Sequence, residues 1–222
     1  MEVSKKVAFI KDWILNYVNS MPKKAQSLVI GISGGIDSSV TSTLCAMTGI
    51  KTIVLTMPIK QKVDQYDLSI KHQKWLIDKF NNVEAHTISL DELFNSFKSS
   101  LSKFDNDHGM ANSRARLRMT TLYQVASANN GIVVGTGNKV EDFGIGFYTK
   151  YGDGGVDISP IADCNKSEVW ELGKGLNILN EIIEAPPTDG LWDDGRTDEG
   201  QLGLSYKELE EAMDNEKSIN RE

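Results

Sequence analysis

One short segment of the sequence combines the side chains and the backbone freedom needed to bind phosphate. Residues 31–39 read GISGGIDSS and lie between an apolar run and an amphipathic run. Gly34 and Gly35 can adopt positive φ, so that backbone N–H groups converge on an anion. A helix beginning near Ser38 would add its N-terminal partial positive charge, and Ser33 would add a hydroxyl donor. The segment therefore predicts a phosphate-binding loop.

Asp37 is an unusual residue for such a loop, because its charge would repel phosphate unless a cation lay between them. A role as a Mg²⁺ ligand explains its presence. The loop is not a Walker A motif, since no lysine follows the glycines, and it is not a GxGxxG dinucleotide motif. A tight strand-to-helix turn that merely contains glycines is the alternative interpretation.

Two kinds of periodicity alternate along the chain and would position this loop. Apolar runs typical of buried strands occur at residues 27–32, 51–57, 83–88, 131–136 and 158–161. Patterns typical of helices occur at residues 3–18, 38–48, 64–80, 91–104, 111–129 and 205–214, and another helix opens at 166–173. The alternation predicts an α/β fold with a doubly wound, mostly parallel five-stranded sheet and helices on both faces. Ligands of such sheets bind at the carboxyl ends of the strands.

Length and composition narrow the class of protein. The chain has 222 residues, of which 40% are hydrophobic and 25% charged, which suits one soluble domain spanning 1–222. No apolar run approaches the ~20 residues of a membrane span, and the N-terminus lacks the apolar stretch of a signal peptide. Cys45 and Cys164 are far apart, which argues against a disulfide scaffold or a zinc ribbon. We expect a cytoplasmic protein without a membrane partner.

The acidic residues concentrate at the C-terminal end. Residues 189–222 contain eleven acidic and four basic side chains, so this segment accounts for the whole net charge of −7. The preceding residues are formally neutral, and no broad basic surface for nucleic acid is expected. Residues 185–203 are long, irregular and rich in Gly, Pro and Asp, which predicts a mobile lid.

The phosphate loop resembles that of the ATP pyrophosphatases, also called PP-loop enzymes. Their loop holds the pyrophosphate half of ATP, and they transfer AMP. Further motifs follow in order, namely GTGNKVE at residues 135–141, FYTKYGDGGVD at 147–157, NKSE at 165–168 and PPTDGLW at 186–192. With them, the chain from about residue 27 to about residue 213 resembles the ammonia-dependent NAD⁺ synthetases, which have an adenine nucleotide alpha hydrolase-like fold.

The resemblance implies an enzyme that amidates deamido-NAD⁺ with ammonia and ATP, giving NAD⁺, AMP and pyrophosphate through an acyl-adenylate. Adenylylation turns the carboxylate oxygen into a leaving group, so no Ser or Cys nucleophile is required. Catalysis would rest on positioning and charge neutralisation at phosphorus. The family is homodimeric, with substrate sites at the subunit interface. No glutaminase domain is expected in residues 1–26, so free ammonia is the expected nitrogen source.

The resemblance also assigns roles to individual residues. Asp37 and Glu141 match Mg²⁺ ligands, and together with Lys166 they are the expected catalytic residues. The expected ATP-binding residues are Gly31, Ser33, Gly34, Gly35, Asp37, Ser38, Thr136, Lys166 and Thr188. The expected contacts to deamido-NAD⁺ are Arg116, Lys150 and Asp157. One departure is at the C-terminus, where residues 216–222 lack the His-Lys pair with which family members commonly contact deamido-NAD⁺.

Other interpretations remain open at this point. Another PP-loop enzyme, of a tRNA-thiolating or GMP-amidating type, would share the loop. Thiolation usually needs paired cysteines, and a GMP-amidating enzyme would lack the segment at 147–157. A non-catalytic adenine-nucleotide-binding relative would keep the fold without turnover. The roles of Arg114, Arg118 and Trp192 are also left open by the sequence.

Overall fold

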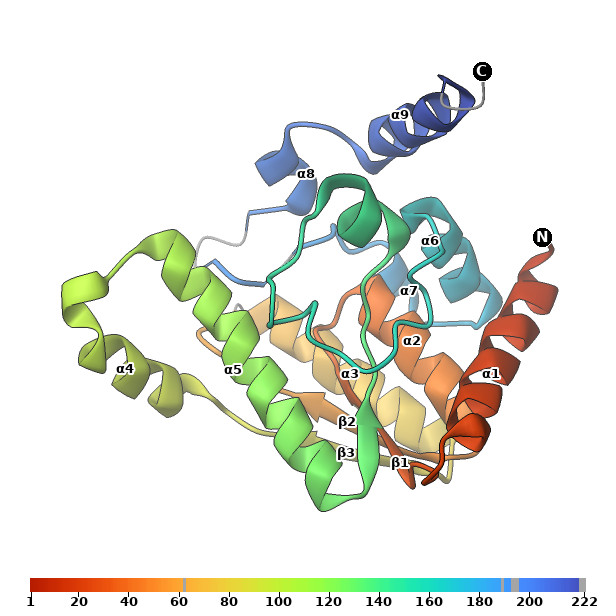
Figure 1. Ribbon diagram of the computed structural model, residues 1–222, viewed down its shortest axis with the longest axis horizontal. Helices are drawn as coiled ribbons and strands as arrows, with labels where there is room; N and C mark the ends of the chain where they lie inside the picture. Colours follow the sequence, from red (N-terminus) through yellow and green to blue (C-terminus); the bar gives the residue numbers. More distant parts are fainter. Residues whose placement is uncertain (62, 189, 193–195, 220–222) are drawn as a thin grey trace.

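Four parallel strands form the centre of the fold in the computed structural model, which describes residues 1–61, 63–188, 190–192 and 196–219. The strand order is β3-β2-β1-β4 (Figure 1). The strands are β1 (Ser27–Gly31), β2 (Lys51–Thr56), β3 (Val83–Thr87) and β4 (Gly131–Val133). β1 lies between β2 and β4, so the loop that follows β1 emerges near the middle of the carboxyl edge of the sheet.

Side chains of β1 alternate between two hydrophobic cores, one on each face of the sheet. Leu28 and Ile30 belong to the larger core, whereas Val29 belongs to the smaller one. This two-residue period explains why a continuous apolar run forms a strand that is covered on both faces.

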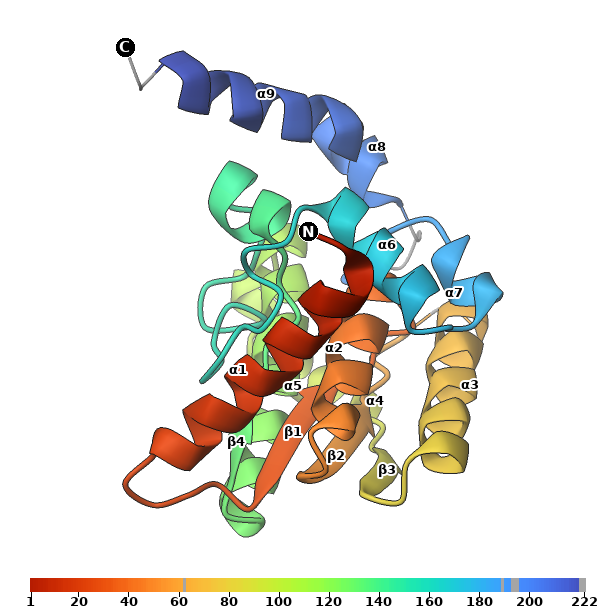
Figure 2. The same ribbon diagram turned by 90° about the vertical axis from the view of Figure 1, so that its right-hand side faces the viewer.

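Helices cover both faces of the sheet. The larger core receives α1 (Val3–Ser20), α2 (Ile36–Met47), α3 (Val63–Lys79), α6 (Lys166–Gly175) and α7 (Asn180–Ile183). The smaller core receives α4 (Asp91–Ser100) and α5 (Asp107–Ala128). Figure 2 shows α1 lying across α2, with its buried residues at helical spacing. The doubly wound, parallel arrangement expected from the sequence is therefore confirmed.

The remaining elements lie beyond the carboxyl edge of the sheet. They are the 3₁₀ turn η1 (Ser102–Phe104) after α4, the π-helix η2 (Val140–Ile145), α8 (Asp198–Leu202) and α9 (Tyr206–Ile219). In Figures 1 and 2, α9 lies outside both helical layers, next to α6 and η2. The C-terminal segment thus reaches the same edge as the loop after β1.

The expected fifth strand at 158–161 is wrong for the part of the chain that the structure describes. Ile158 makes a single parallel bridge to Val134, and Pro160 then lacks the N–H that a continuing ladder would need. The neighbouring Asp157 side chain accepts a hydrogen bond from the Val133 backbone N–H, at 2.7 Å, and so replaces a ladder carbonyl.

Several helix boundaries also differ from expectation, and the helix expected at 205–214 extends to Ile219. The helix expected at 91–104 ends at Ser100 and continues only as η1. The helix expected from residue 111 begins at Asp107, because the Asn106 side chain caps it by accepting a hydrogen bond from the Gly109 N–H. The expected lid at 185–203 contains α8, and its residues 189 and 193–195 lie outside the described residues. No helix of the described chain has the length and apolarity of a membrane span.

Candidate active site

The loop after β1 has the backbone geometry of an anion-binding turn. Gly34 has φ +92°, and a Cβ added there would lie 2.6 Å from the Gln65 carbonyl oxygen. Only glycine therefore fits this position without strain. α2 begins at Ile36 with Gly35 as its N-cap, and this glycine offers no side chain to cap the first-turn N–H groups. The N–H groups there face the carboxyl edge of the sheet, where an anionic ligand would bind.

Serine hydroxyls hold the loop together through short-range contacts. Ser38 Oγ donates to the Gly35 carbonyl at 3.1 Å and accepts from the Ser33 N–H at 3.2 Å. Ser33 Oγ in turn lies 3.1 Å from Ser38 Oγ and accepts from the Gly35 N–H at 3.1 Å. The loop is therefore shaped by residues within five positions of one another before any ligand binds.

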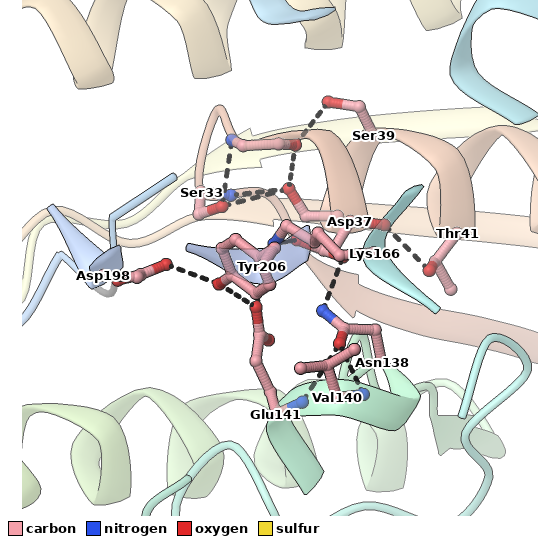
Figure 3. A network of polar contacts seen from close by, with 12 residues as sticks. Ser33, Asp37, Ser39, Thr41, Asn138, Val140, Glu141, Lys166, Asp198 and Tyr206 are labelled. Atoms are coloured by element: carbon pink, nitrogen blue, oxygen red, sulfur yellow. Dashed lines mark hydrogen bonds and ion pairs between the residues drawn. The ribbon is translucent and has the colours of Figure 1, made fainter. Parts of the chain in front are cut away.

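Four side chains meet beside the loop in what we name the carboxylate corner, made of Asp37, Glu141, Lys166 and Tyr206 (Figure 3). Lys166 Nζ donates to Asp37 Oδ2 at 2.6 Å and to Glu141 Oε1 at 2.9 Å. The Lys166 side chain is only 2% exposed. The three residues that the sequence assigned to catalysis thus lie in direct contact, although they come from α2, η2 and α6.

Asn138 orients two of these groups and was not singled out from the sequence. Its Nδ2 donates to Asp37 Oδ1 at 3.0 Å, while its Oδ1 accepts from the backbone N–H groups of Val140 and Glu141 at 3.1 Å each. The side chain is fully buried. Its place inside the GTGNKVE motif, between the glycines and Glu141, was the available signal.

The sequence assigned no role to Tyr206 or Asp198. The Tyr206 hydroxyl donates to Glu141 Oε1 at 2.6 Å and lies 3.2 Å from Asp198 Oδ2. These residues open α9 and α8, far along the chain from Glu141. Nothing in the pattern of an ordinary amphipathic helix marks a tyrosine at its start as part of a polar site.

The charges of the corner stabilise one another. Burial lowers the pKa of Lys166, but Asp37 and Glu141 more than offset this effect and hold its pKa above the usual range. Burial raises the pKa of Glu141, whereas the Lys166 charge and the Tyr206 hydrogen bond outweigh it and leave the pKa below its usual value. For Asp37, burial dominates and raises the pKa despite Lys166. Lys166 and Glu141 are therefore a charged pair at neutral pH.

A cavity of about 650 Å³ opens in front of the loop and the corner. Most of the site residues expected from the sequence line it, namely Gly31, Ser33, Gly35, Asp37, Ser38, Arg116, Thr136, Glu141, Lys150, Lys166 and Thr188. Two of the expected residues do not line it. Gly34 is buried behind the turn, and Asp157 points to the sheet, where it bonds the Val133 N–H and the Tyr123 hydroxyl.

Other side chains that line the cavity come from separate segments of the chain. Arg116 Nε on α5 donates to the Lys150 carbonyl at 3.2 Å, which holds the two expected substrate residues together. Thr188 Oγ1 accepts a hydrogen bond from Gln65 Nε2 on α3. Arg118 also lines the cavity and donates to the Met57 carbonyl at 3.0 Å.

Arg114 and Trp192 each take part in a contact between an arginine and an aromatic ring. Arg114 is buried, with its guanidinium 4.9 Å from the centre of the Phe94 ring, so it belongs to the α4–α5 packing. Trp192 lines the cavity and lies under the Arg196 guanidinium at 4.2 Å.

The fold and the site together define a nucleotide-binding α/β protein, in which a glycine-rich loop and a carboxylate pair share the carboxyl edge of a parallel sheet. The NAD synthase family matches residues 6–222, and the chain belongs to that family.

Relatives and solved structures agree with this membership. The chain is 39% identical over 209 residues to the NH(3)-dependent NAD(+) synthetase of Methanosarcina acetivorans, covering 90% of this chain and 78% of that protein. It is similar to the NMN synthetase from Francisella tularensis, with TM-score 0.84 and 36% identity, covering 96% of this chain and 84% of the other. The NH3-dependent NAD synthetase from Campylobacter jejuni gives TM-score 0.74 and 30% identity, covering 83% and 77%.

Proposed function

We propose that the chain amidates deamido-NAD⁺ with ammonia in an ATP-dependent reaction that yields NAD⁺, AMP and pyrophosphate. One observation carries this proposal beyond family membership. Beside the phosphate loop, Lys166 Nζ lies 2.6 Å from Asp37 Oδ2 and 2.9 Å from Glu141 Oε1, and the sequence assigned all three residues to catalysis. A protein that only bound a nucleotide would not need two carboxylates and a lysine beside that loop.

The residues present fit a Mg²⁺ ion that enters with ATP. No group of three or more His, Cys, Asp or Glu able to hold a metal occurs within the described part of the chain. Mg²⁺ often uses only one or two carboxylates and completes its shell with substrate phosphates and water. Asp37 and Glu141 would supply those two carboxylates once Lys166, which bonds both of them in this structure, turns to the phosphates. When bound, the ion supplies positive charge to the phosphate oxygens.

The chain's own side chains act mainly by positioning and neutralising charge. The N–H groups in the first turn of α2 would hold the pyrophosphate half of ATP, and Lys166 would meet the negative charge that grows on the leaving pyrophosphate. The substrate carboxylate oxygen attacks the α-phosphorus, and pyrophosphate leaves. Ammonia then adds to the acyl carbon of the adenylate, loses a proton and displaces AMP. No step needs a protein nucleophile.

Residues 185–203 would act as a lid over this reaction. Pro186, Thr188 and Trp192 line the cavity, and Thr188 is tied to α3 through Gln65. A cover that excludes water protects an acyl-adenylate from hydrolysis, which would otherwise compete with free ammonia.

The family resemblance also suggests a homodimer with the substrate site at its interface. The segment after Glu141 exposes large apolar side chains, namely Phe143, Tyr148 and Tyr151, which are 72%, 47% and 65% exposed. Lys150 Nζ lies 5.1 Å from the centre of the Tyr151 ring. A second copy of the chain would cover this surface beside the expected substrate contacts. Light scattering on the purified protein measures the mass and decides between monomer and dimer.

A mononucleotide substrate is the second candidate, because the similar structure with TM-score 0.84 is an NMN synthetase. The chemistry would be unchanged, since only the group attached beyond the nicotinate ribose phosphate differs. Comparing kcat/KM for deamido-NAD⁺ and for nicotinate mononucleotide separates the two. A higher value for the mononucleotide would overturn deamido-NAD⁺ as the main substrate.

The proposed activity is tested by incubating the protein with ATP, Mg²⁺, ammonium and deamido-NAD⁺ and measuring NAD⁺ and AMP. We expect AMP to form only when deamido-NAD⁺ is present. The matched variant is Asp37→Asn, which keeps the shape of the side chain and removes a metal ligand. It should abolish turnover while leaving the circular dichroism spectrum unchanged. Wild-type rates in this variant would contradict the assignment of Asp37, and ATP binding without AMP in the wild type would favour a non-catalytic protein.

A further inference from the structure

The C-terminal helix contributes a polar group to the carboxylate corner. Tyr206, the first residue of α9, is only 2% exposed, and its hydroxyl donates to Glu141 Oε1 at 2.6 Å. The same carboxylate oxygen accepts from Lys166 Nζ at 2.9 Å. Two donors from different helices therefore converge on one oxygen and restrict the rotation of the Glu141 carboxylate (Figure 3).

The tyrosine ring is held by apolar packing that does not involve its hydroxyl. The Trp170 ring meets it edge-on, with 6.0 Å between centroids and an angle of 89°. Val140 and Leu209 complete a small hydrophobic cluster around it. Lys166 Nζ lies 4.7 Å from the ring centre. A phenylalanine would satisfy all of these contacts equally well.

Separate contacts dock the rest of α9 against the same edge. Glu210 accepts hydrogen bonds from the backbone N–H and the hydroxyl of Ser167, at 2.8 and 2.6 Å, near the N-terminus of α6. Met213 packs against the backbone of Gly144 in η2, where a Cβ would lie 2.6 Å from the methionine sulfur. The position of the helix therefore does not depend on the Tyr206 hydroxyl alone.

The hydroxyl has a function that packing does not explain. A phenol buried beside carboxylates loses water contacts, and it offsets this cost by donating a hydrogen bond. Its shorter contact is to Glu141, whereas Asp198 lies 3.2 Å away. Hydrogen bonds to charged groups are the strong ones, so the bond to Glu141 determines the orientation of that carboxylate.

We infer that Tyr206 is a positioning residue whose hydroxyl keeps the Glu141 carboxylate turned toward Asp37 and Lys166. The two carboxylates can then share one divalent cation when Lys166 turns to the phosphates. The inference rests on the proposed function, because it takes the two carboxylates as the metal ligands. The inference makes α9 part of the site, although Tyr206 lies 65 positions from Glu141 in the sequence.

The test measures metal affinity rather than turnover. Mn²⁺ serves as the probe, titrated by electron paramagnetic resonance in the presence of α,β-methylene-ATP. The variant is Tyr206→Phe, which retains the ring and removes only the hydroxyl. The control is Glu210→Ala, which removes a docking contact of the same helix and leaves the hydroxyl in place. Asp37→Asn provides the reference for loss of a ligand, and thermal unfolding shows whether each variant is folded.

We expect Tyr206→Phe to weaken Mn²⁺ binding about tenfold, as loss of a hydrogen bond to a charged group implies. Its Tm should stay close to that of the wild type, and Glu210→Ala should bind Mn²⁺ as the wild type does. Equal affinity in Tyr206→Phe and wild type would overturn the inference. So would an equal loss in Glu210→Ala, because the helix as a whole would then be responsible.

The same titration separates this inference from the proposed function. A wild-type chain that binds no Mn²⁺ with the ATP analogue overturns both the proposed metal ligands and the role of Tyr206. A wild-type chain whose binding is lost in Asp37→Asn but kept in Tyr206→Phe overturns the role of Tyr206 alone.

Discussion

The phosphate loop and the carboxylate corner face the same cavity but are built in different ways. In the loop, Ser33, Gly35 and Ser38 bond one another within five positions of sequence. In the corner, Lys166 lies 129 positions from Asp37 and 25 from Glu141. Asp37 belongs to both regions and joins them.

The two regions are stabilised by different interactions. The loop depends on backbone geometry and local hydrogen bonds, so it changes only when its own residues change. The corner contains buried charges, whose desolvation is offset only while every partner is present. Removing one partner there should cost more than a local change in the loop, and outlying contacts of either region should matter less.

The largest effect is expected for Lys166→Met. Methionine keeps much of the volume but leaves two partly buried carboxylates without their counter-charge, so we expect a loss of about 4 kcal/mol in the free energy of unfolding. The rate of AMP formation should fall by about three orders of magnitude, because the lysine that meets the triphosphate is gone. Urea unfolding and initial rates measure the two effects.

The matched control for this variant is Lys174→Met on the same helix. Lys174 pairs with Glu171 at 2.7 Å, but both side chains are more than half exposed. It should change the free energy of unfolding by less than about 0.5 kcal/mol. Similar losses in the two variants would show that the corner is not the more sensitive region.

The next effect is expected in the loop itself, for Gly34→Ala. The residue has φ +92°, and the added Cβ would meet the Gln65 carbonyl at 2.6 Å, so we expect a loss of about 3 kcal/mol in urea unfolding. Gly49→Ala separates strain from collision, since Gly49 has φ +78° with nothing within 4 Å. That control should lose about 1 kcal/mol. Equal losses of unfolding free energy in Gly34→Ala and Gly49→Ala would show that the contact with the Gln65 carbonyl on α3 adds no cost to the positive φ.

A smaller effect is expected from acid, through the helix that follows the loop. Burial lowers the pKa of His72 to about 4 from 6.5, and its Nε2 lies 3.0 Å from the Ser42 hydroxyl on α2. Between these pH values the unfolded chain binds more protons than the folded one, so stability falls as the pH drops below 6.5. The loss attributable to His72 is about 2 kcal/mol at pH 5.

The measurement compares urea unfolding at pH 7.5 and pH 5 in wild type and His72→Gln. Between pH 7.5 and pH 5, the free energy of unfolding should decrease by about 2 kcal/mol less in His72→Gln than in the wild type. This difference does not depend on the stability of the variant at pH 7.5. His86→Gln, at an exposed histidine, should retain the wild-type decrease. An unchanged decrease in His72→Gln would show that His72 does not carry this pH dependence.

The smallest effect is expected for Lys6→Met, an outlying support of the corner. Lys6 pairs with Glu168 at 2.5 Å, and Glu168 also belongs to the capping box of α6. Since Glu168 is 43% exposed, the loss should be about 1 kcal/mol in thermal or urea unfolding. Lys71→Met, which breaks the more exposed pair with Glu181, should lose less still. A larger loss at Lys71 would reverse this ranking.

Most of the fold followed from local patterns. The four strands and the loop were predictable, because apolar runs of strand length and the SGGIDSS turn reflect neighbours in sequence. The fifth strand was predicted wrongly, because Ile158 and Ile161 share the apolar character of a strand while Pro160 and the Asp157 side chain end the pairing after one bridge. The periodicity of apolar residues indicates burial, but it does not show which backbone N–H and C=O groups remain able to extend a strand.

The site was only partly predictable, and the missed residues have a common cause. Asn138 lies inside a motif but acts through both ends of its amide, which only the geometry reveals. Tyr206 and Asp198 come from the acidic C-terminal segment, in which the sequence assigned no site residue. Their contacts depend on how α8 and α9 pack, and no local pattern encodes that.

The sequence by itself determined the phosphate loop, because glycine conformations and serine hydrogen bonds act over a few residues and need no distant partner. It also supplied the charges of the site as separate motifs along the chain. Only the tertiary structure decided that Lys166 lies between Asp37 and Glu141, with Tyr206 donating to Glu141. Contacts of a few ångströms between distant segments depend on the packing of whole helices, and that packing follows from the two hydrophobic cores as a whole.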